Sequence, residues 1–494
     1  MRNFLSRYPL FLLTIPGTYL VHVANYYFRL FSWRPVIGEL VLYIIIPVSI
    51  YATFTRSPKR REKAGVLLFA FLVVLYFFHL WHDWLKLPYS IDLPLLAIGA
   101  IALVIYVKRR KKSFAGFYYA GNIIFGLLFV GGIGENIYLR ITTDGSEHDH
   151  ANPSKQIVRE FSPCDTCARP DIYYIILDGY TNSKTLQQEF NYNNAWIKNY
   201  LKNKNFYLVE NSKSNYYFTQ PSIASILNMD YLRRLDTEKL FYTREFFQSH
   251  YTIFHNELSQ VLEKQGYSIN NYSIFDLKGH PSRVSPFLEK LVHRSVVGQT
   301  FFYKLNRDIG YHIHPLFRRQ IVNAGVEEAI KDIERIEQTR NGVIEVAKAE
   351  KQQPQFTYAH FILPHETFFF DSTGKKNDLA AIINNGLPEN NYVMQVAYTN
   401  KFVIAPIVDS IFAHARRPFI VIFQGDHGYR DYPPEKIDLE FENFNAIYFP
   451  EGKYDMLKDT MTSVNTFRIV LNQFFNQQLP LLNDSTVYLK KRNL

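Results

Sequence analysis

The run Ile172-Tyr-Tyr-Ile-Ile-Leu177, followed at once by Asp178-Gly179, is the stretch that decides the fold of this 494-residue chain. Every position in the run is apolar or aromatic, as expected for a strand covered on both faces of a parallel sheet. Similar runs occur at 356–363 and 418–423, and longer stretches with helical spacing separate the three. This alternation predicts an α/β domain with a mainly parallel sheet covered by helices.

Polar residues that suit a binding site follow each of these runs. The first run ends at Asp178, the second at Pro364-His365 and the third just before Gly425-Asp-His-Gly428. Ligands of open α/β sheets bind beyond the carboxyl ends of the strands, so we expect these residues to meet in one site. Taken singly, Asp178 could be a turn residue and His365 a buried core histidine.

Thr219 opens the segment Thr219-Gln-Pro-Ser-Ile-Ala-Ser-Ile-Leu-Asn228, which we interpret as the start of a helix. Pro221 suits a first helical turn, because the N–H that it lacks would have no intrahelical partner there. The free N–H groups of such a terminus favour an anion. Thr219 is therefore a candidate nucleophile, with a simple N-cap as the plainer reading.

The residue types predict one divalent metal ion. Asp178, Asp426 and His427 offer carboxylate oxygens and an imidazole, and the Thr219 hydroxyl adds a further oxygen. This set suits Zn²⁺ or Mn²⁺ best, with Mg²⁺ and Ca²⁺ as weaker candidates. Metal coordination would lower the pKa of the Thr219 hydroxyl, which could then attack phosphorus and form a phosphothreonine intermediate.

Three further residues complete the list of site candidates. His365 is expected to hydrogen-bond a phosphoryl oxygen or to protonate a leaving group. Arg430, three residues beyond His427, could neutralise charge that develops in the transition state. His280, in Lys-Gly-His-Pro, could touch a substrate, although a plain loop residue is the favoured interpretation.

The first 140 residues predict an N-terminal bundle of about five transmembrane helices, at 8–28, 36–54, 64–81, 91–107 and 114–134. No small-residue cleavage site closes the first segment, so we interpret it as an uncleaved anchor rather than a signal peptide. Residues 141–169 have the composition of a linker, and 170–494 form the predicted catalytic domain. We expect residues 326–349 and 465–475 to form surface and packing helices without a role in the chemistry.

Positive charge predicts the orientation of these spans. The loops around 56–63 and 108–112 hold ten basic residues against Glu62, a net of +9 out of the formal +10 of the chain. Both loops should be cytoplasmic, so five spans would carry the catalytic domain to the extracytoplasmic side of the cell (inner) membrane. The rest of the chain is nearly neutral, which argues against a nucleic-acid partner. The sequence does not indicate an oligomeric state.

Cys164 and Cys167, the two cysteines of the chain, precede Pro170 in Cys-Asp-Thr-Cys. Outside the cytoplasm, a local disulfide is the expected state of such a pair. A thioredoxin-like role would require the pair to open a helix after a strand, which this loop does not offer.

These motifs, in the order Leu-Asp-Gly, Thr-x-Pro-Ser-x-x-Ser-Ile-Leu-Asn, Pro-His and Gly-Asp-His-Gly, resemble the sulfatase-like branch of the alkaline phosphatase superfamily. The layout, with spans before an outer domain, is similar to that of lipoteichoic acid synthases and lipid A phosphoethanolamine transferases. The resemblance implies that Asp178, Thr219, Asp426 and His427 bind the metal, that Thr219 is the nucleophile and that His365 binds substrate.

The departures from the family pattern indicate a subtype. True sulfatases use a formylglycine from Cys or Ser in Cys/Ser-x-Pro-Ser-Arg, whereas this chain has Thr219 first and Ile223 last. The single Asp178 and the lack of recognisable ligands for a second metal resemble the transferases. We therefore predict a membrane-embedded phosphotransferase that moves a phospho-head-group from a membrane lipid to an envelope lipid or glycan. The alternatives are a hydrolase of phosphate or sulfate esters and a non-catalytic envelope protein that binds a glycan or lipid.

Overall fold

The computed structural model describes residues 2–26, 44–53, 57–144, 156–232, 243–284, 297–310, 315–385 and 390–489. The chain forms two compact units. The helical unit contains Met1–Asp149 and Leu288–Arg319, and the sheet unit contains His150–Phe287 and Gln320–Leu494. The domain boundaries at 140 and 170 stay a prediction. The structure differs from a simple division at these points, because it assigns 288–319 to the helical unit.

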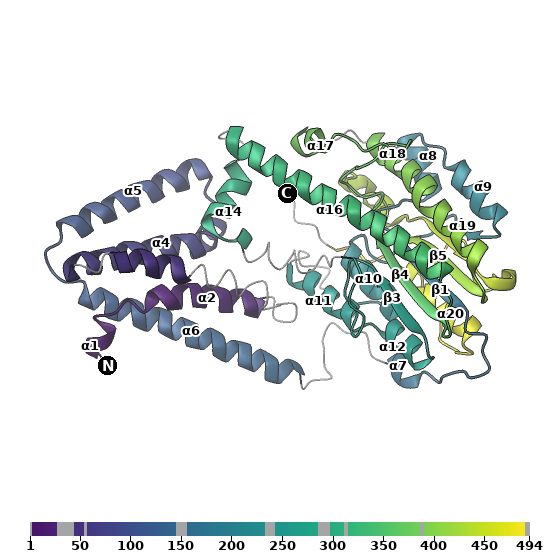
Figure 1. The fold of residues 1–494 in the computed structure, drawn as a ribbon, viewed down its shortest axis with the longest axis horizontal. Helices are drawn as coiled ribbons and strands as arrows, with labels where there is room; N and C mark the ends of the chain where they lie inside the picture. Colours follow the sequence, from purple (N-terminus) through teal and green to yellow (C-terminus); the bar gives the residue numbers. More distant parts are fainter. Residues whose placement is uncertain are drawn as a thin grey trace. The chain divides into compact units, whose positions relative to one another are not determined.

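The helical unit is built from apolar helices at the five places that the sequence predicts (Figure 1). The second predicted segment is seen only as Ile44–Thr53, and its other residues lie outside the described ranges. Among the described residues of this unit, three helices are long and apolar enough to cross a membrane: Lys59–Leu85, Tyr89–Arg109 and Ala115–Leu139. The chain is thus a multi-pass membrane protein. Its elements here are α1 (Arg2–Leu5), α2 (Phe11–Tyr26), α4 (Pro58–Leu85), α5 (Tyr89–Arg109), α6 (Ala115–Asp144), α14 (Phe301–Leu305) and η1 (Asn306–Gly310).

A fourth helix of spanning length, Asn390–His414, belongs to the sheet unit. The apolar 18-residue stretch of this helix is 67% buried, whereas the corresponding stretches of α5 and α6 are 11% and 17% buried. Its own side chains Val396, Val403 and Ile407 are members of the hydrophobic core. Because most of its apolar side chains are buried by its own domain, we interpret it as a core helix rather than a membrane span.

In the part of the chain that the structure describes, the sheet unit is centred on six strands in the order β2-β6-β5-β1-β4-β3. The strands β5, β1, β4 and β3 are parallel, and β6 pairs antiparallel with both β5 and β2. This confirms the predicted mainly parallel sheet. The strands are β1 (Asp171–Leu177), β2 (Tyr207–Leu208), β3 (Ser268–Tyr272), β4 (Gln355–Phe361), β5 (Phe419–Gly425) and β6 (Asn445–Tyr448).

Helices cover both faces of this sheet (Figure 1). Alternate residues of β1 point to opposite faces: Tyr173 and Ile175 join one core cluster, and Ile172 and Tyr174 the other. The first cluster packs under α8, α9, α16, α18 and α19, and the second under α10, α12 and α20. The helices and turns of this unit are α7 (Gln156–Glu160), α8 (Ser183–Phe190), α9 (Ala195–Asn203), α10 (Thr219–Asn228), α11 (Thr243–Phe254), α12 (Glu257–Lys264), α16 (Pro315–Lys348, begun in the helical unit), α17 (Leu379–Asn385), α18 (Asn390–Tyr398), η2 (Thr399–Ile404), α19 (Ala405–His414), η3 (Pro434–Phe441), η4 (Pro450–Gly452), η5 (Ser463–Asn465) and α20 (Thr466–Phe474).

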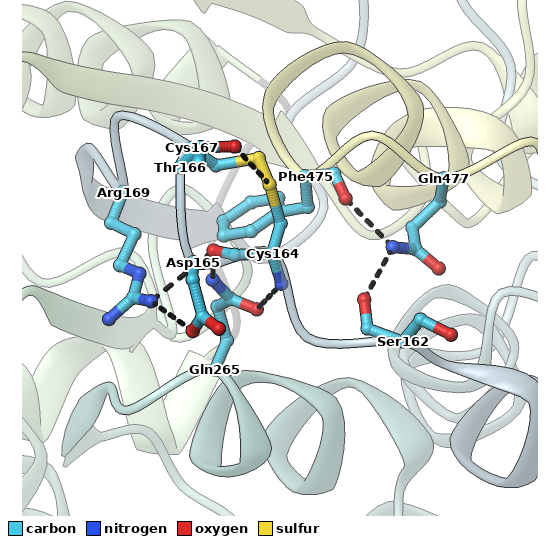
Figure 2. The surroundings of a disulfide bond; sticks show 9 residues. All are labelled: Ser162, Cys164, Asp165, Thr166, Cys167, Arg169, Gln265, Phe475 and Gln477. Carbon is cyan, nitrogen blue, oxygen red and sulfur yellow. Dashed lines mark hydrogen bonds and ion pairs between the residues drawn. A yellow bond between two sulfur atoms is a disulfide. The ribbon is translucent and has the colours of Figure 1, made fainter.

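The segment just before β1 is fastened to the sheet unit rather than free. Cys164 and Cys167 form a disulfide, as expected (Figure 2). The side chain of Gln265 donates to the Cys164 carbonyl at 2.6 Å and accepts from the Cys164 N–H at 2.9 Å. Upstream, Ile157 of α7 is buried in the core. The second half of the expected linker is therefore an ordered part of the domain.

Candidate metal centre and active site

The parallel register of the sheet places Asp178 beside Asp426. Leu177, the last residue of β1, pairs with Gly425, the last residue of β5, so the next residue along each strand is a buried aspartate. The Asp178 N–H donates to the carbonyl of Phe361 at the end of β4, at 2.9 Å. The carboxyl ends of three neighbouring strands thus lie together at one edge of the sheet, with Asp178 and Asp426 side by side.

The glycines of Gly425-Asp-His-Gly428 are required by close backbone approach. A Cβ on Gly425 would lie 2.5 Å from the carbonyl oxygen of Tyr180, and one on Gly428 would lie 2.5 Å from that of Glu442. These distances are far below van der Waals contact, and the atoms that would be struck belong to the backbone. The two glycines therefore let the turn that carries Asp426 and His427 pack against its neighbours.

Thr219 is the first residue of α10, and its side chain faces His427. The Thr219 Oγ lies 3.3 Å from Nε2 of His427. One turn further, the Ser222 hydroxyl donates to the carbonyl of Asp426 at 2.5 Å and ties the helix to the β5 turn. The preceding Phe218 offers no side-chain cap, so the N–H groups of the first turn are left for another acceptor.

The hydrogen bonds of His427 direct its second nitrogen into the site. Nδ1 lies 2.6 Å from the carbonyl oxygen of Gly428 and must donate to it, because a carbonyl only accepts. Nε2 then carries the lone pair of the neutral ring. It lies 3.4 Å from Oδ1 of Asp178 and 3.5 Å from Oδ2 of Asp426.

The donor atoms fit a bound divalent metal ion. Asp178 Oδ1 and Asp426 Oδ2 are buried and have no hydrogen-bond partner among the described residues. Ligands in a tetrahedral zinc site with bonds of about 2.0 Å stand roughly 3.3 Å apart, close to the 3.3, 3.4 and 3.5 Å found around His427 Nε2. A cation between them would satisfy both of these carboxylate oxygens. Two carboxylates with imidazole suit Zn²⁺ or Mn²⁺.

The electrostatics of the site favour the ionised form of Asp178. Burial opposes ionisation of this carboxyl group, but His365, His360 and His427 together outweigh that effect. The pKa of Asp178 is held well below its usual range. The group is therefore ready to bind a cation as a carboxylate.

His360 is a member of the site that sequence analysis missed. It lies on β4 opposite Ile176 of β1, and it is 1% exposed. Its ring, Asp178 and Asp426 offer ligand atoms that all lie within 4.8 Å of one another. The available signal was a histidine inside an otherwise apolar strand, but only the pairing of β4 with β1 shows what it faces.

His365 and Arg430 lie together at the edge of the site. The Arg430 guanidinium contacts Nε2 of His365, and Nδ1 of His365 donates to the carbonyl of Glu366 at 2.6 Å. With Arg430 donating, His365 Nε2 is an acceptor in this arrangement, so the expected role as a proton donor to a leaving group requires the pair to separate. The ring centroids of His365 and His427 are 6.2 Å apart.

Two buried side chains of α18 hold the turns around the site, and neither was singled out from the sequence. The Gln395 side chain donates to the His365 carbonyl at 2.7 Å and accepts from the Phe369 N–H at 2.6 Å. The Tyr392 hydroxyl donates to the carbonyl of Gly179 at 2.7 Å. They fix the loop after β4 and the turn after β1.

A cleft of about 240 Å³ opens beside these residues. Its walls are aromatic, with charged side chains among them: Gly179, Phe218, His365, Glu366, Phe368, Tyr392, Tyr429, Arg430 and Asp431. Gly179 follows Asp178 directly in the chain, and Phe218 directly precedes Thr219. The cleft therefore borders the turn that follows β1 and the start of α10.

His280 has a structural partner. Its Nε2 lies 2.6 Å from a carboxylate oxygen of Glu263, and its backbone closes a turn with Leu277. This agrees with its interpretation as a loop residue.

No curated protein matches the chain. Among solved structures, it is similar to the C-terminal periplasmic domain of EptC from Escherichia coli, with 12% identity, a TM-score of 0.40, and coverage of 68% of this chain and 94% of that one. It is also similar to the integral membrane protein lipooligosaccharide phosphoethanolamine transferase A from Neisseria meningitidis, with 9% identity, a TM-score of 0.35, and coverage of 97% and 96%. For the lipoteichoic acid synthase LtaP from Listeria monocytogenes, the identity is 14%, the TM-score 0.33, and the coverage 68% and 80%.

The family assignment rests on a separate match. The Sulfatase family model matches residues 195–474, more than half of the 494 residues. The matched range contains Thr219, His360, His365, Asp426 and His427, and it begins after Asp178. The chain belongs to the sulfatase family.

Proposed function

We propose that this protein is a membrane-embedded, metal-dependent phosphotransferase that moves a phospho-head-group from a membrane lipid to an envelope lipid or glycan. The transfer passes through a covalent intermediate on Thr219. Asp178, Asp426, His427 and Thr219 hold one divalent metal ion, with Zn²⁺ or Mn²⁺ as the best candidates.

The observation that carries this proposal is the position of the Thr219 hydroxyl. It lies 3.3 Å from His427 Nε2, next to two buried aspartates with unpartnered oxygens, and at the N-terminus of a helix. A hydroxyl at a cation site is a potential nucleophile, and a helix N-terminus stabilises an anionic group that arrives there. A side chain that only capped the helix would not need this cluster of acids around it.

The chemistry follows in two steps. A bound metal ion would lower the pKa of the Thr219 hydroxyl and would place positive charge next to the phosphoryl oxygens. In the first step, Thr219 Oγ loses its proton and forms a bond to phosphorus, while the bond from phosphorus to the oxygen of the lipid alcohol breaks and that oxygen takes up a proton. In the second step, the acceptor hydroxyl loses its proton and attacks the phosphothreonine, and Thr219 Oγ leaves and is reprotonated.

Other groups of the chain would bind and orient the substrate. Arg430 offers a cation at the cleft for the phosphoryl group, and His365 holds Arg430 in place. The aromatic walls of Phe218 and Tyr429 suit the apolar parts of a head group and exclude water from it.

Membrane attachment supports a lipid donor. Helices that hold the enzyme in the bilayer raise the effective concentration of lipids at its active site, which a hydrolase of small soluble esters would not need. The basic loops around 56–63 and 108–112 support a cytoplasmic location for those loops, and hence an extracytoplasmic site.

Hydrolysis of phosphate or sulfate esters is the second candidate function, and the Sulfatase family match favours it. The same nucleophile would serve, with water as the acceptor in the second step. Thr219 takes the position at which sulfatases carry the formylglycine precursor, which argues against sulfate-ester hydrolysis by their usual route.

Intact mass spectrometry of the full-length protein in detergent tests the proposal. The protein is incubated with Zn²⁺ or Mn²⁺ and phospholipids that differ in head group, as wild type and as Thr219→Ala. We expect wild type to gain the mass of a phospho-head-group, and Thr219→Ala to gain none. Ser225→Ala is the matched control, because its hydroxyl lies on the same helix but donates to the Asp230 carbonyl.

The fate of the adduct separates the candidate functions. Loss of the adduct only on addition of a lipid or glycan acceptor supports the transferase, and rapid loss to water supports the hydrolase. A metal-loaded wild type that never forms an adduct and releases no head group would favour a binding protein and sink both catalytic proposals.

A further inference from the structure

His360 is a buried histidine whose ring nitrogens have no hydrogen-bond partner among the described residues. Neutral imidazole carries one donor and one acceptor, and leaving both unpaired in the interior costs free energy. Such a residue is rarely kept for packing alone, since an apolar side chain of similar size would fit the same place at lower cost. The burial of His360 next to the two aspartates therefore points to a functional role.

The two carboxylates of the site differ in how they are held. Oδ1 of Asp426 accepts from the N–H groups of Gly179 and His427, both at 3.0 Å, and its Oδ2 faces His427 Nε2. One oxygen is thus anchored and the other is directed into the site. Asp178 directs Oδ1 into the site in the same way, at 3.4 Å from His427 Nε2. His360 Nε2 lies 3.6 Å from Oδ2 of Asp178.

We propose that His360 is a positioning residue, whose Nε2–H holds Oδ2 of Asp178 so that Oδ1 is presented to the metal ion. The inference rests on the metal centre of the proposed function. The separation of 3.6 Å is a few tenths of an ångström beyond a hydrogen bond, and a small turn of the carboxylate closes it. Groups that hydrogen-bond a ligating carboxylate fix its orientation and commonly raise metal affinity by about 10- to 100-fold.

The strand geometry makes His360 the natural anchor for Asp178. His360 pairs with Ile176 in the β1–β4 register, so its side chain stays near the end of β1 without entering the cleft. Its ring packs near Phe275, with the ring centroids 5.7 Å apart. A rigid strand and a packed ring give the imidazole little freedom, which is what an orienting group needs.

Two substitutions separate a hydrogen-bonding role from packing and from direct ligation. His360→Gln keeps an N–H donor near the position of Nε2, whereas His360→Phe keeps the volume and the contact with Phe275 but has no donor. The full-length protein is purified in detergent, stripped of metal and titrated with Zn²⁺ against a chromophoric chelator. X-ray absorption at the zinc edge counts the imidazoles bound to the metal.

We expect His360→Phe to bind Zn²⁺ about 10- to 100-fold more weakly than wild type, and His360→Gln to stay within about threefold. The number of bound imidazoles should be one in wild type and in both variants. The metal-free His360→Phe protein should unfold at the same temperature as wild type or higher, because it lacks the unpaired nitrogens. His250→Phe is the matched control, since His250 is buried against the same Phe275 ring; its zinc affinity should not change.

Three results would overturn the inference. His360→Phe with wild-type zinc affinity would show that no donor is required. Equal loss in His360→Gln and His360→Phe, with two imidazoles bound in wild type, would make His360 a direct ligand. A wild type that binds no zinc or manganese would remove the metal centre itself and would count against the proposed function, which the other two results leave intact.

Discussion

Glu257 is a single buried residue that contributes to the pH dependence of the sheet unit. It is 1% exposed at the start of α12, and one carboxylate oxygen accepts from the Val158 N–H of α7 at 2.9 Å. Burial raises the pKa of Glu257 to about 7, although the backbone donors of α7 oppose that rise. The same contact holds α7 against the domain, in a stretch that composition alone classifies as linker.

We predict that this residue makes the sheet unit less stable as the pH rises. The pKa in the folded state lies above the unfolded value of 4.5, so the folded state binds the proton more tightly. The contribution is fully present below about pH 4.5 and is lost as the pH rises through 7, a change on the order of 3 kcal/mol. Glu257→Gln, which keeps the acceptor but does not ionise, should show a smaller drop in unfolding temperature between pH 5 and pH 8 than wild type. Parallel pH profiles for the two proteins would refute the prediction.

At the scale of elements, α14 and η1 are the main surprise of the structure. They lie between α12 and α16 in the sequence, yet they join the helical unit. Phe301 packs edge-on against Phe78 of α4, with ring centroids 4.9 Å apart. The Tyr89 hydroxyl of α5 donates to Asp308 at 2.6 Å. A helix of five residues cannot be stable by itself, so these contacts with α4 and α5 must hold it.

The ion pair between Lys304 and Asp83 provides a test of this packing. The Lys304 side chain is 9% exposed and that of Asp83 is 57% exposed, so solvent screens the pair only in part. We predict that Lys304→Asp, which places two carboxylates together, lowers the stability of the full-length protein in detergent by about 1–2 kcal/mol. The double variant Lys304→Asp with Asp83→Lys should recover most of that loss. Additive losses in the double variant would show that the two side chains do not interact in the membrane protein.

At the scale of the whole molecule, the charge of the loops predicts the side of the membrane on which the chemistry occurs. Since Cys164 and Cys167 are joined and are the only cysteines, a single added thiol reports its own location. We predict that Glu451→Cys, at an exposed position of the sheet unit, reacts with a membrane-impermeant maleimide in intact spheroplasts. Lys111→Cys, in the second basic loop, should react only after the membrane is permeabilised. The opposite pattern would place the site in the cytoplasm and would rule out an envelope acceptor.

Much of this protein follows from local sequence. Apolar runs of about 20 residues indicate membrane helices, and shorter runs between helical stretches indicate the strands of a sheet. Both patterns are carried by neighbours in the chain, although the buried helix Asn390–His414 shows that length alone does not separate a membrane helix from a core helix. The convergence of Asp178 and Asp426-His427 follows from the same logic, because parallel strands end at one edge. Thr219 follows no parallel strand, and the packing of α10 places its hydroxyl beside His427.

Tertiary structure decided the rest, because it depends on pairings between residues far apart in the chain. The role we propose for His360 depends on the register between β1 and β4, residues about 180 positions apart, and no local pattern specifies which side chain it faces. The contact between His365 and Arg430 and the packing of α14 on α4 also join residues far apart in the chain, so no local pattern predicts them. A five-residue helix is not stable by itself, and a single histidine forms no sequence pattern. Their positions therefore depend on packing against residues far away in the chain.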